Sequence, residues 1–259
     1  MSSSSASEKE DFQSLKDKRI LVTGAGRGIG RALVKRLYGI GAQVIALSKT
    51  KDFLESLKSE CPDIQIVQQD LSNWNETRER VEWRPLESLP SVDGLVNNAG
   101  ISILEPFLEV KEETFDKLMN VNVKAVLNVS QIIATRMIKD GKEGSIVNIS
   151  SIGGIHPRRN HFSYNTSKAA LDMMTKVMAL ELGPHKIRTN SLNPGITMTD
   201  MGKMAWSDPE KVDPELQRTP LKRFAEVEEV VDGICFLLSP SSAIINGACI
   251  VQDGGRILG

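Results

Sequence analysis

Short apolar runs recur along the chain and alternate with longer amphipathic stretches. The runs are rich in β-branched residues and almost continuously apolar, which is typical of strands buried on both faces of a parallel sheet. The helical periodicity between them predicts crossover helices, and therefore a doubly wound α/β fold with helices on both faces of the sheet. We expect seven strands, at residues 19–23, 43–48, 64–68, 94–97, 145–150, 188–192 and 249–251.

The two longest helical patterns run over about residues 114–139 and 160–182. Each is apolar around much of its circumference, so each needs more burial than one face of a sheet offers. We expect both helices to pack on the sheet and also to form an interface between subunits. Because no repeat or change in composition marks a boundary, we expect one domain at 15–259 after a disordered lead at 1–14.

The composition excludes several classes of protein. The chain is 40% apolar and 25% charged with a net charge of -1, as in ordinary globular enzymes. Its 32 basic residues are scattered among 33 acidic ones, so we expect no nucleic-acid partner. No window approaches the roughly 18 apolar residues of a membrane span, and no apolar leader stands near the N-terminus, which favours a cytoplasmic protein. Cys61, Cys235 and Cys249 form no paired motif, so we expect neither disulfides nor a metal site.

A glycine-rich loop, TGAGRGIG at residues 23–30, joins the first strand to the following helix. Glycines permit a tight turn and a close approach of a ligand to the backbone, and the first amides of the helix then face a pyrophosphate. The order of strand, loop and helix predicts a Rossmann-type dinucleotide site. No Lys-Ser or Lys-Thr pair follows the glycines, which argues against phosphoryl transfer. The candidate ligands in the loop are Gly24, Arg27, Gly28, Ile29 and Gly30.

The end of the second strand indicates which dinucleotide binds. In NAD-binding units, an acidic residue about 20 positions beyond the loop usually holds the adenosine ribose. Here the strand ends with Ser48, Lys49 and Thr50 instead. A lysine and a serine can bind a 2′-phosphate that a carboxylate would repel, and Arg27 supplies a second cation. These residues predict NADP(H) as the cofactor.

A serine, a tyrosine and a lysine form the candidate catalytic set. Ser151 follows the strand at 145–150, Tyr164 comes thirteen residues later, and Lys168 lies one helical turn beyond Tyr164. A free phenol has a pKa of about 10, and a nearby cation lowers such a pKa by roughly 1 to 3 units. We therefore expect Lys168 to make Tyr164 an effective acid or base, and Ser151 to hydrogen-bond a substrate oxygen.

Together these motifs resemble the short-chain dehydrogenase/reductase family. The resemblance covers about residues 15–255 and implies that NADPH reduces a small carbonyl compound, with Tyr164 as proton donor. Ser151 would orient the carbonyl, and Lys168 would also bind the nicotinamide ribose. The resemblance further implies a homotetramer, and a water held by Asn122 that links Lys168 to solvent. The motifs that carry it are the glycine loop, NNAG at 97–100, ISS at 149–151, YNTSK at 164–168 and NPG at 193–195.

The resemblance also implies contacts along the rest of the cofactor. One pair of residues would contact the adenine, a loop after the fourth strand would line the dinucleotide, and two residues would hold the nicotinamide carboxamide. In the same order, these are Asp70 and Leu71; Asn97, Ala99 and Gly100; and Ile196 and Thr199.

Longer stretches narrow the match to the branch of the family that reduces pentuloses and small α-dicarbonyls such as diacetyl. They lie at 43–50, 106–110, 171–188, 206–209 and 224–228. This similarity implies a substrate lid at 198–215, with Trp206 closing the pocket and His161 as a candidate substrate contact. The chain departs from that branch at 81–90, 152–154 and 256–259, and we expect the glycines at 153 and 154 to make the pocket wall more flexible.

Two other functions compete with this one. A 3-oxoacyl thioester reductase or another carbonyl reductase would use the same catalytic residues, and an acyl carrier would favour a basic patch that Arg158, Arg159 and Lys203 could form. An NADP-binding sensor or scaffold without turnover is the alternative from another class, although it would not need the serine, tyrosine and lysine in register. A serine hydrolase is excluded because no G-x-S-x-G motif surrounds Ser151.

Overall fold

The computed structural model describes residues 12–83 and 91–259. The expected N-terminal lead at 1–14 lies outside the described residues except for its last three positions, and so does most of the 81–90 segment. A short 3-10 turn, η1 (Gln13–Leu15), precedes the first strand, and Leu15 is buried in the core.

The described chain forms one sheet of seven parallel strands in the order β3-β2-β1-β4-β5-β6-β7, so the predicted fold is confirmed. Five of the seven strands are almost fully buried along their length, as their continuous apolar runs indicated. The bounds differ from the predicted ones by at most two residues. They are β1 (Arg19–Thr23), β2 (Gln43–Ser48), β3 (Gln65–Gln68), β4 (Gly94–Asn97), β5 (Gly144–Ile149), β6 (Ile187–Pro194) and β7 (Cys249–Gln252).

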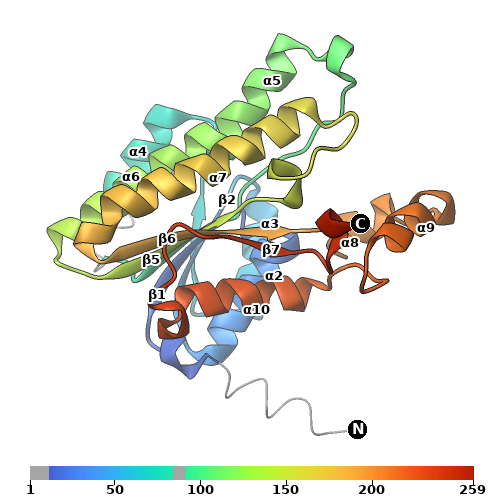
Figure 1. Cartoon of the computed structure of the whole chain (residues 1–259). Helices are drawn as coiled ribbons and strands as arrows, with labels where there is room; N and C mark the ends of the chain where they lie inside the picture. The colour runs from blue at the N-terminus through green and yellow to red at the C-terminus, as the bar shows by residue number, and fades with distance from the viewer. Residues whose placement is uncertain (1–11, 84–90) are drawn as a thin grey trace, which may run out of the picture.

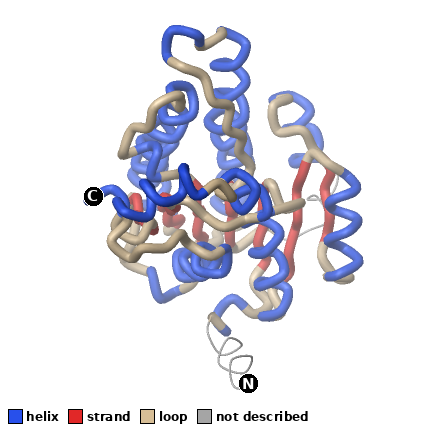
Figure 2. Tube along the Cα trace, turned by 90° about the vertical axis from the view of Figure 1, so that its right-hand side faces the viewer, coloured by secondary structure: helices blue, strands red, loops and turns tan. Residues whose placement is uncertain are grey.

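Helices cover both faces of this sheet, as Figures 1 and 2 show. One apolar cluster joins the sheet to α2 (Gly28–Ile40), α3 (Lys51–Glu60) and α10 (Val227–Leu238). A second cluster joins the opposite face to α6 (Ala125–Lys139) and α7 (Phe162–Leu182), and α4 (Trp74–Trp83) packs beside α6. The remaining elements are α5 (Glu112–Met119), α8 (Asp200–Ala205), α9 (Pro209–Arg218), the π turn η3 (Asn120–Lys124), and the 3-10 turns η2 (Phe107–Glu109), η4 (Ile152–Gly154), η5 (Gly183–His185), η6 (Pro240–Ser242) and η7 (Arg256–Leu258).

The prediction of one continuous helix over 114–139 is wrong in detail. The structure has α5, then one π turn at η3, then α6. A π turn adds a residue to one helical turn, and here the turn contains the buried Asn122. The second long helix begins at Phe162 rather than at 160, because Asn160 has a left-handed backbone with φ of 62° that an α-helix cannot include.

The order of the strands reverses between β1 and β4, and this position marks a crevice at the edge of the sheet. β1 pairs with β2 on one side and with β4 on the other, so the loops after β1 and β4 diverge to opposite faces at the carboxyl edge of the sheet. In doubly wound sheets a ligand binds in the crevice at this position. Among the described helices, none has the length and hydrophobicity that a membrane crossing requires.

Candidate active site

The glycine loop after β1 has a backbone that only glycine fits well. Gly24 and Gly28 have φ of 64° and 55°, in the left-handed region. A Cβ atom at Gly30 would collide with the Gly24 carbonyl oxygen and would lie 2.5 Å from Asn98 Nδ2. These glycines therefore allow a tight turn directly before α2, and a pyrophosphate binds to the first amides of a helix that follows such a turn.

Asn98 is a residue of this site that the sequence reasoning missed. Its Nδ2 donates to the carbonyl oxygens of Thr23 and Gly24, each at 3.1 Å, so it fixes the glycine loop to the end of β4. Asn97 has a different role from the expected one, because its side chain is buried and donates to Ser130 Oγ and Asn148 Oδ1. The NNAG motif was the available signal, and its second asparagine carries the contact.

The end of β2 lies beside the glycine loop, because a Cβ atom at Gly26 would be 3.0 Å from Ser48 Oγ. Lys49 and Arg27 are exposed there, and Lys49 Nζ forms an ion pair with Asp70 Oδ2 at 2.8 Å. Partial burial would raise the pKa of Asp70, but hydrogen bonds from Lys49 and Ser72 outweigh it and hold that pKa below its usual value. Asp70 therefore stays ionised and offsets part of the Lys49 charge.

Of two further residues expected near the adenosine, Thr50 is exposed and Leu71 is buried. Thr50 is exposed at the start of α3, next to Lys49. Leu71 is buried in the apolar cluster under α6, so its side chain belongs to the core rather than to the crevice.

The catalytic candidates meet where β5 ends and α7 begins. Ser151 Oγ accepts a hydrogen bond from the Gly153 N–H at 3.0 Å and is hydrogen-bonded to the Tyr164 hydroxyl. Lys168 Nζ lies 5.8 Å from the centre of the Tyr164 ring and donates to the Ile149 carbonyl oxygen at 2.8 Å. The structure thus brings together all three residues that the motif spacing selected.

Burial dominates the ionisation of this site. It raises the pKa of Tyr164 above its ordinary value, against a hydrogen bond from Ser151 and the charge of Arg158. It also lowers the pKa of Lys168 to about 8, against the nearby Asp172 carboxylate. The expected fall in the Tyr164 pKa through Lys168 is therefore wrong for this arrangement, because the cost of burying a phenolate exceeds the opposing effects.

Asn122 lies in the π turn, close to the candidate catalytic residue Lys168. Its Oδ1 accepts from the Ile101 N–H at 2.9 Å, and its Nδ2 donates to the Ile101 carbonyl and to Ser167 Oγ, each at 3.0 Å. A Cβ atom at Gly100 would be 3.4 Å from Asn122 Oδ1 and 3.6 Å from Lys168 Nζ. The loop after β4 therefore packs directly against Asn122 and Lys168.

Asp172 is a second residue that the sequence reasoning missed, and it supports the site through buried hydrogen bonds. Its carboxylate is buried and accepts hydrogen bonds from Ser191 Oγ at 3.1 Å and Asn193 Nδ2 at 2.8 Å. Asn193 Nδ2 also donates to the Ser151 carbonyl oxygen at 3.0 Å. Asp172 follows Lys168 by one helical turn, and this spacing together with the NPG motif was the signal that could have revealed it.

The expectation of a flexible pocket wall at 152–154 is wrong. Ile152 and Gly153 are buried, and a Cβ atom at Gly153 would be 2.7 Å from the side-chain amide of Asn165. A Cβ atom at Gly154 would be 2.6 Å from Asp172 Oδ2. The glycines are thus required by close packing against α7 rather than by mobility.

The segment expected to form the lid contains two helices, α8 and α9, and the second extends to residue 218 rather than 215. Thr199 caps α8 through its Oγ1, and its Cγ2 would lie 3.5 Å from a Cβ atom at Gly28, so the lid starts opposite the glycine loop. Ile196 lies just before it and is half-buried, and its carbonyl oxygen accepts from the Ala225 N–H.

The two predicted substrate contacts, His161 and Trp206, lie at the start of α7 and at the end of α8. The His161 ring centre is 6.3 Å from that of Tyr164 in an edge-on arrangement, and His161 Nδ1 lies 2.6 Å from the Arg159 carbonyl oxygen. Trp206, at the end of α8, packs against Phe224 with ring centres 5.6 Å apart. The structure therefore places both predicted substrate contacts on elements that border the crevice.

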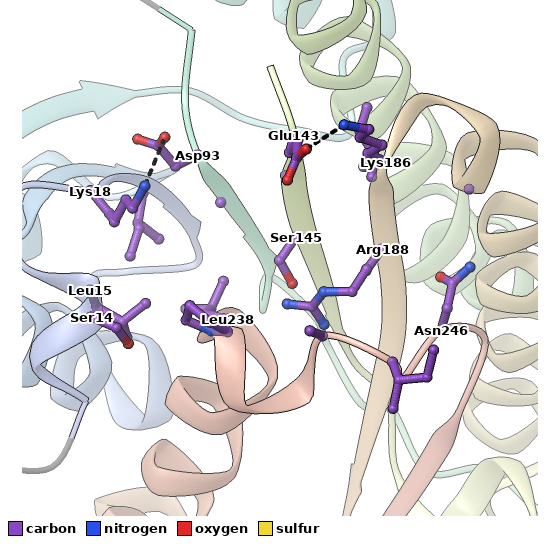
Figure 3. Close-up of a pocket in the computed structure, with 18 residues that line it drawn as sticks. Ser14, Leu15, Lys18, Asp93, Glu143, Ser145, Lys186, Arg188, Leu238 and Asn246 are labelled. Atoms are coloured by element: carbon purple, nitrogen blue, oxygen red, sulfur yellow. Dashed lines mark hydrogen bonds and ion pairs between the residues drawn. The ribbon is translucent and has the colours of Figure 1, made fainter. Parts of the chain in front are cut away.

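A separate cavity of about 510 Å³ lies at the opposite, amino-terminal edge of the sheet. Figure 3 shows Lys18 paired with Asp93 and Lys186 paired with Glu143 around it. The Arg188 guanidinium points toward the end of α10, where it donates to the Leu237 and Ser239 carbonyl oxygens. The Lys18, Lys186 and Arg188 cations of this cavity are thus all engaged by protein groups, and none of the predicted catalytic or cofactor residues lines it.

Comparison with known proteins agrees with this geometry. The family model described as short chain dehydrogenase matches residues 18–210. The chain is 52% identical to L-xylulose reductase of Mesocricetus auratus over 94% of this chain and 98% of that protein. It is 47% identical to carbonyl reductase (NADPH) 2 of Sus scrofa over 92% and 96%. A solved structure of 4-hydroxyisoleucine dehydrogenase complexed with NADH superposes with a TM-score of 0.88 at 33% identity, over 93% of this chain and 99% of that one.

Proposed function

Because this chain belongs to the short-chain dehydrogenase family, and is an oxidoreductase acting on CH–OH and C=O groups, we propose that it uses NADPH to reduce small ketoses and α-dicarbonyls such as L-xylulose and diacetyl. The observation that carries the proposal is the meeting of Ser151, Tyr164 and Lys168 beside the crevice where the strand order reverses.

The residues of the crevice fit a dinucleotide. The glycine loop turns tightly at the start of α2, where a Cβ atom at Gly30 would displace the Gly24 carbonyl, and Thr199 lies opposite Gly28 across this loop. When bound, NADPH supplies the hydride. A carbonyl oxygen would then accept a hydrogen bond from the Ser151 hydroxyl, and Tyr164 would donate its proton to the same oxygen. The charge of Lys168 favours the tyrosinate that this transfer leaves.

The preference for NADPH over NADH rests on the end of β2. Ser48, Lys49 and Arg27 offer a hydroxyl and two cations to a 2′-phosphate, and no acidic residue stands at the end of that strand. Asp70 offsets part of the Lys49 charge, so Arg27 becomes the more important cation. We expect the Michaelis constant for NADPH to rise in the double variant Arg27→Ala, Lys49→Ala while that for NADH changes little. An unchanged constant for NADPH would contradict this assignment.

The function is tested by following NADPH oxidation with L-xylulose, diacetyl and an acetoacetyl thioester in parallel, and by repeating the assay with NADH. Turnover of the first two with NADPH is the expected result. Tyr164→Phe should abolish turnover and leave NADPH binding nearly intact, because the ring is kept and only the proton donor is lost. Substantial reduction by this variant, or turnover of the thioester alone, would overturn the proposal.

The arrangement of the arginines favours a small substrate over an acyl carrier. Arg158 is engaged with Glu215 at 3.1 Å and lies over the Trp206 ring, so it does not contribute to an open basic patch. Arg159 and Lys203 are exposed, so only two of the three cations expected to form a basic patch are open to an acyl carrier. A sensor or scaffold without turnover is disfavoured because Tyr164 is hydrogen-bonded to Ser151 and lies 5.8 Å, measured from its ring centre, from Lys168 Nζ, an arrangement that mere binding would not need.

We propose that the protein is a homotetramer in which α7 forms part of an interface. Met173, Val177 and Leu180 are exposed on one face of α7, and Leu180 is 79% accessible. Apolar residues at this helical spacing would gain burial against a second copy. Light scattering after chromatography should give the mass of a tetramer, and Leu180→Glu should give a smaller species.

We also propose a cytoplasmic location. Cys61, Cys235 and Cys249 are all free thiols, and the first two are buried. Unpaired cysteines suit a reducing compartment. Fractionation of cells that express the protein, followed by detection of the reductase activity in each fraction, tests this location.

A further inference from the structure

Three segments that are distant in the sequence meet at the carboxylate of Glu215 on the lid helix α9. Its Oε1 is 3.1 Å from Arg158 Nη2, and its Oε2 is 2.8 Å from Arg256 Nε. Arg158 lies in the loop between η4 and α7, and Arg256 begins η7 near the C-terminus, which lies beside α9 in Figure 1. The Glu215 carboxylate thus joins α9, the loop before α7 and the C-terminal segment.

This joint is sheltered from solvent. The Glu215 and Arg256 side chains are 16% and 7% accessible, so their charges are shielded little by water. A charge-assisted pair in such a place is directional, and removal of one partner leaves the other charge uncompensated. The pairing of both Glu215 oxygens therefore fixes the position of α9 relative to Arg158.

Arg158 contacts the other end of the lid as well. Its guanidinium carbon lies 5.3 Å from the centre of the Trp206 ring, at the end of α8, within the range of a cation–π interaction. The backbone of Arg158 is held at the wall through the side chain of Asn165, beside Tyr164. A single arginine thus links both lid helices to the segment that carries the proton donor.

The charge of Arg158 also acts on Tyr164, whose pKa it lowers against the effect of burial. The other charged or titratable groups that face Tyr164 are Lys168 on the same helix and His161 at the start of that helix. When Tyr164 donates its proton it becomes an anion in a buried site, where a nearby cation is worth more than it would be in water.

We propose that Arg158, held by Glu215 with the support of Arg256, is a positioning residue that closes the lid over the substrate and stabilises the tyrosinate formed at Tyr164. In the reduction, the proton passes from Tyr164 Oη to the substrate oxygen and the hydride comes from NADPH. The inference rests on the proposed function, and it makes the C-terminal segment a contributor to the active site.

The test compares Arg158→Gln and Arg158→Lys with Arg159→Gln, a matched control that removes the exposed neighbouring charge. The rates of alcohol oxidation with NADP⁺ are measured against pH, because this direction requires Tyr164 to be ionised. Arg158→Gln should move the limb on which the oxidation rate rises with pH to higher pH, and should slow oxidation about threefold to tenfold at a fixed pH below that limb, for a shift of roughly half to one unit. Arg158→Lys should restore most of that shift, and Arg159→Gln should leave the limb in place.

Glu215→Gln tests the support of Arg158. It should raise the Michaelis constant of the substrate, speed tryptic cleavage within residues 198–218 and move the limb in the same direction as Arg158→Gln. A limb that stays in place in Arg158→Gln, or that moves to lower pH in Glu215→Gln, would overturn the proposal. If the native protein reduces no carbonyl compound, the proposed function fails, and the cleavage assay still decides whether Arg158 and Glu215 hold the lid. Bound NADPH and an unchanged circular dichroism spectrum confirm that each variant is folded.

Discussion

Replacement of Asp172 by asparagine should make the loss of reductase activity at alkaline pH begin about one pH unit lower than in the native protein. Burial lowers the pKa of Lys168 to about 8, and the Asp172 carboxylate opposes that effect. An opposite charge changes a pKa by roughly 1 to 3 units, so its loss lowers the Lys168 pKa further by at least about one unit. At about pH 7.5, the protonated fraction of Lys168 would then fall from about three quarters to about one quarter.

The assay is the turnover number for NADPH-dependent reduction measured from about pH 6 to about pH 9. Near pH 6 Lys168 is charged in both proteins, so their rates should agree to within about twofold. Near pH 7.5 the Asp172→Asn variant should be about threefold slower, and its alkaline limb should lie about one unit lower. Ser191→Ala is the control, since it removes a hydrogen bond to Asp172 and leaves the carboxylate charge in place.

A parallel loss of rate at every pH would refute this reasoning. Asp172 also holds Asn193, which donates to the Ser151 carbonyl oxygen. If the variant mainly displaced Ser151, the rate would fall by a constant factor and the alkaline limb would not move. The shape of the profile therefore separates the loss of charge from the loss of position.

Three other predictions follow from buried groups of the same site. Burial lowers the Lys168 pKa from 10.5 to about 8, so the buried charge destabilises the fold below pH 8, and this cost is absent above pH 10.5. The free energy of unfolding of the native protein, measured with urea relative to that of Lys168→Met, should therefore rise by about 3 kcal/mol between pH 8 and pH 10.5. Asn98→Ala leaves the Thr23 and Gly24 carbonyls without their donor, and a fluorescence titration should show NADPH binding about fivefold weaker or more. Gly30→Ala should weaken NADPH binding more than tenfold, which corresponds to about 1.4 kcal/mol or more, whereas Gly39→Ala, where a Cβ atom meets nothing within 4 Å, should bind normally.

The sheet could be predicted from the sequence because each strand is a short apolar run between helical patterns. The π turn could not, since a single extra residue barely disturbs the periodicity of the long pattern at 114–139. The roles of Asn98 and Asp172 also depend on contacts between segments that are distant in the sequence. Asn98 contacts Gly24, 74 residues away, and Asp172 contacts Asn193, 21 residues away. A local motif identifies the residues that face the ligand more readily than those that hold them.

Burial raises the pKa of Tyr164 and lowers that of Lys168, and under the proposed mechanism this bears on the direction of the reaction. A raised pKa keeps Tyr164 protonated at neutral pH, so it stands ready as a proton donor for reduction. Oxidation needs the ionised tyrosine and therefore a more alkaline pH, where Lys168, with a pKa of about 8, has begun to lose its charge. We expect initial rates of reduction to stay level from about pH 6 to about pH 7.5, and initial rates of alcohol oxidation to be low there and to rise only at higher pH. Equal and level rates in both directions at neutral pH would show that Tyr164 ionises far more easily in the working complex than its buried position implies.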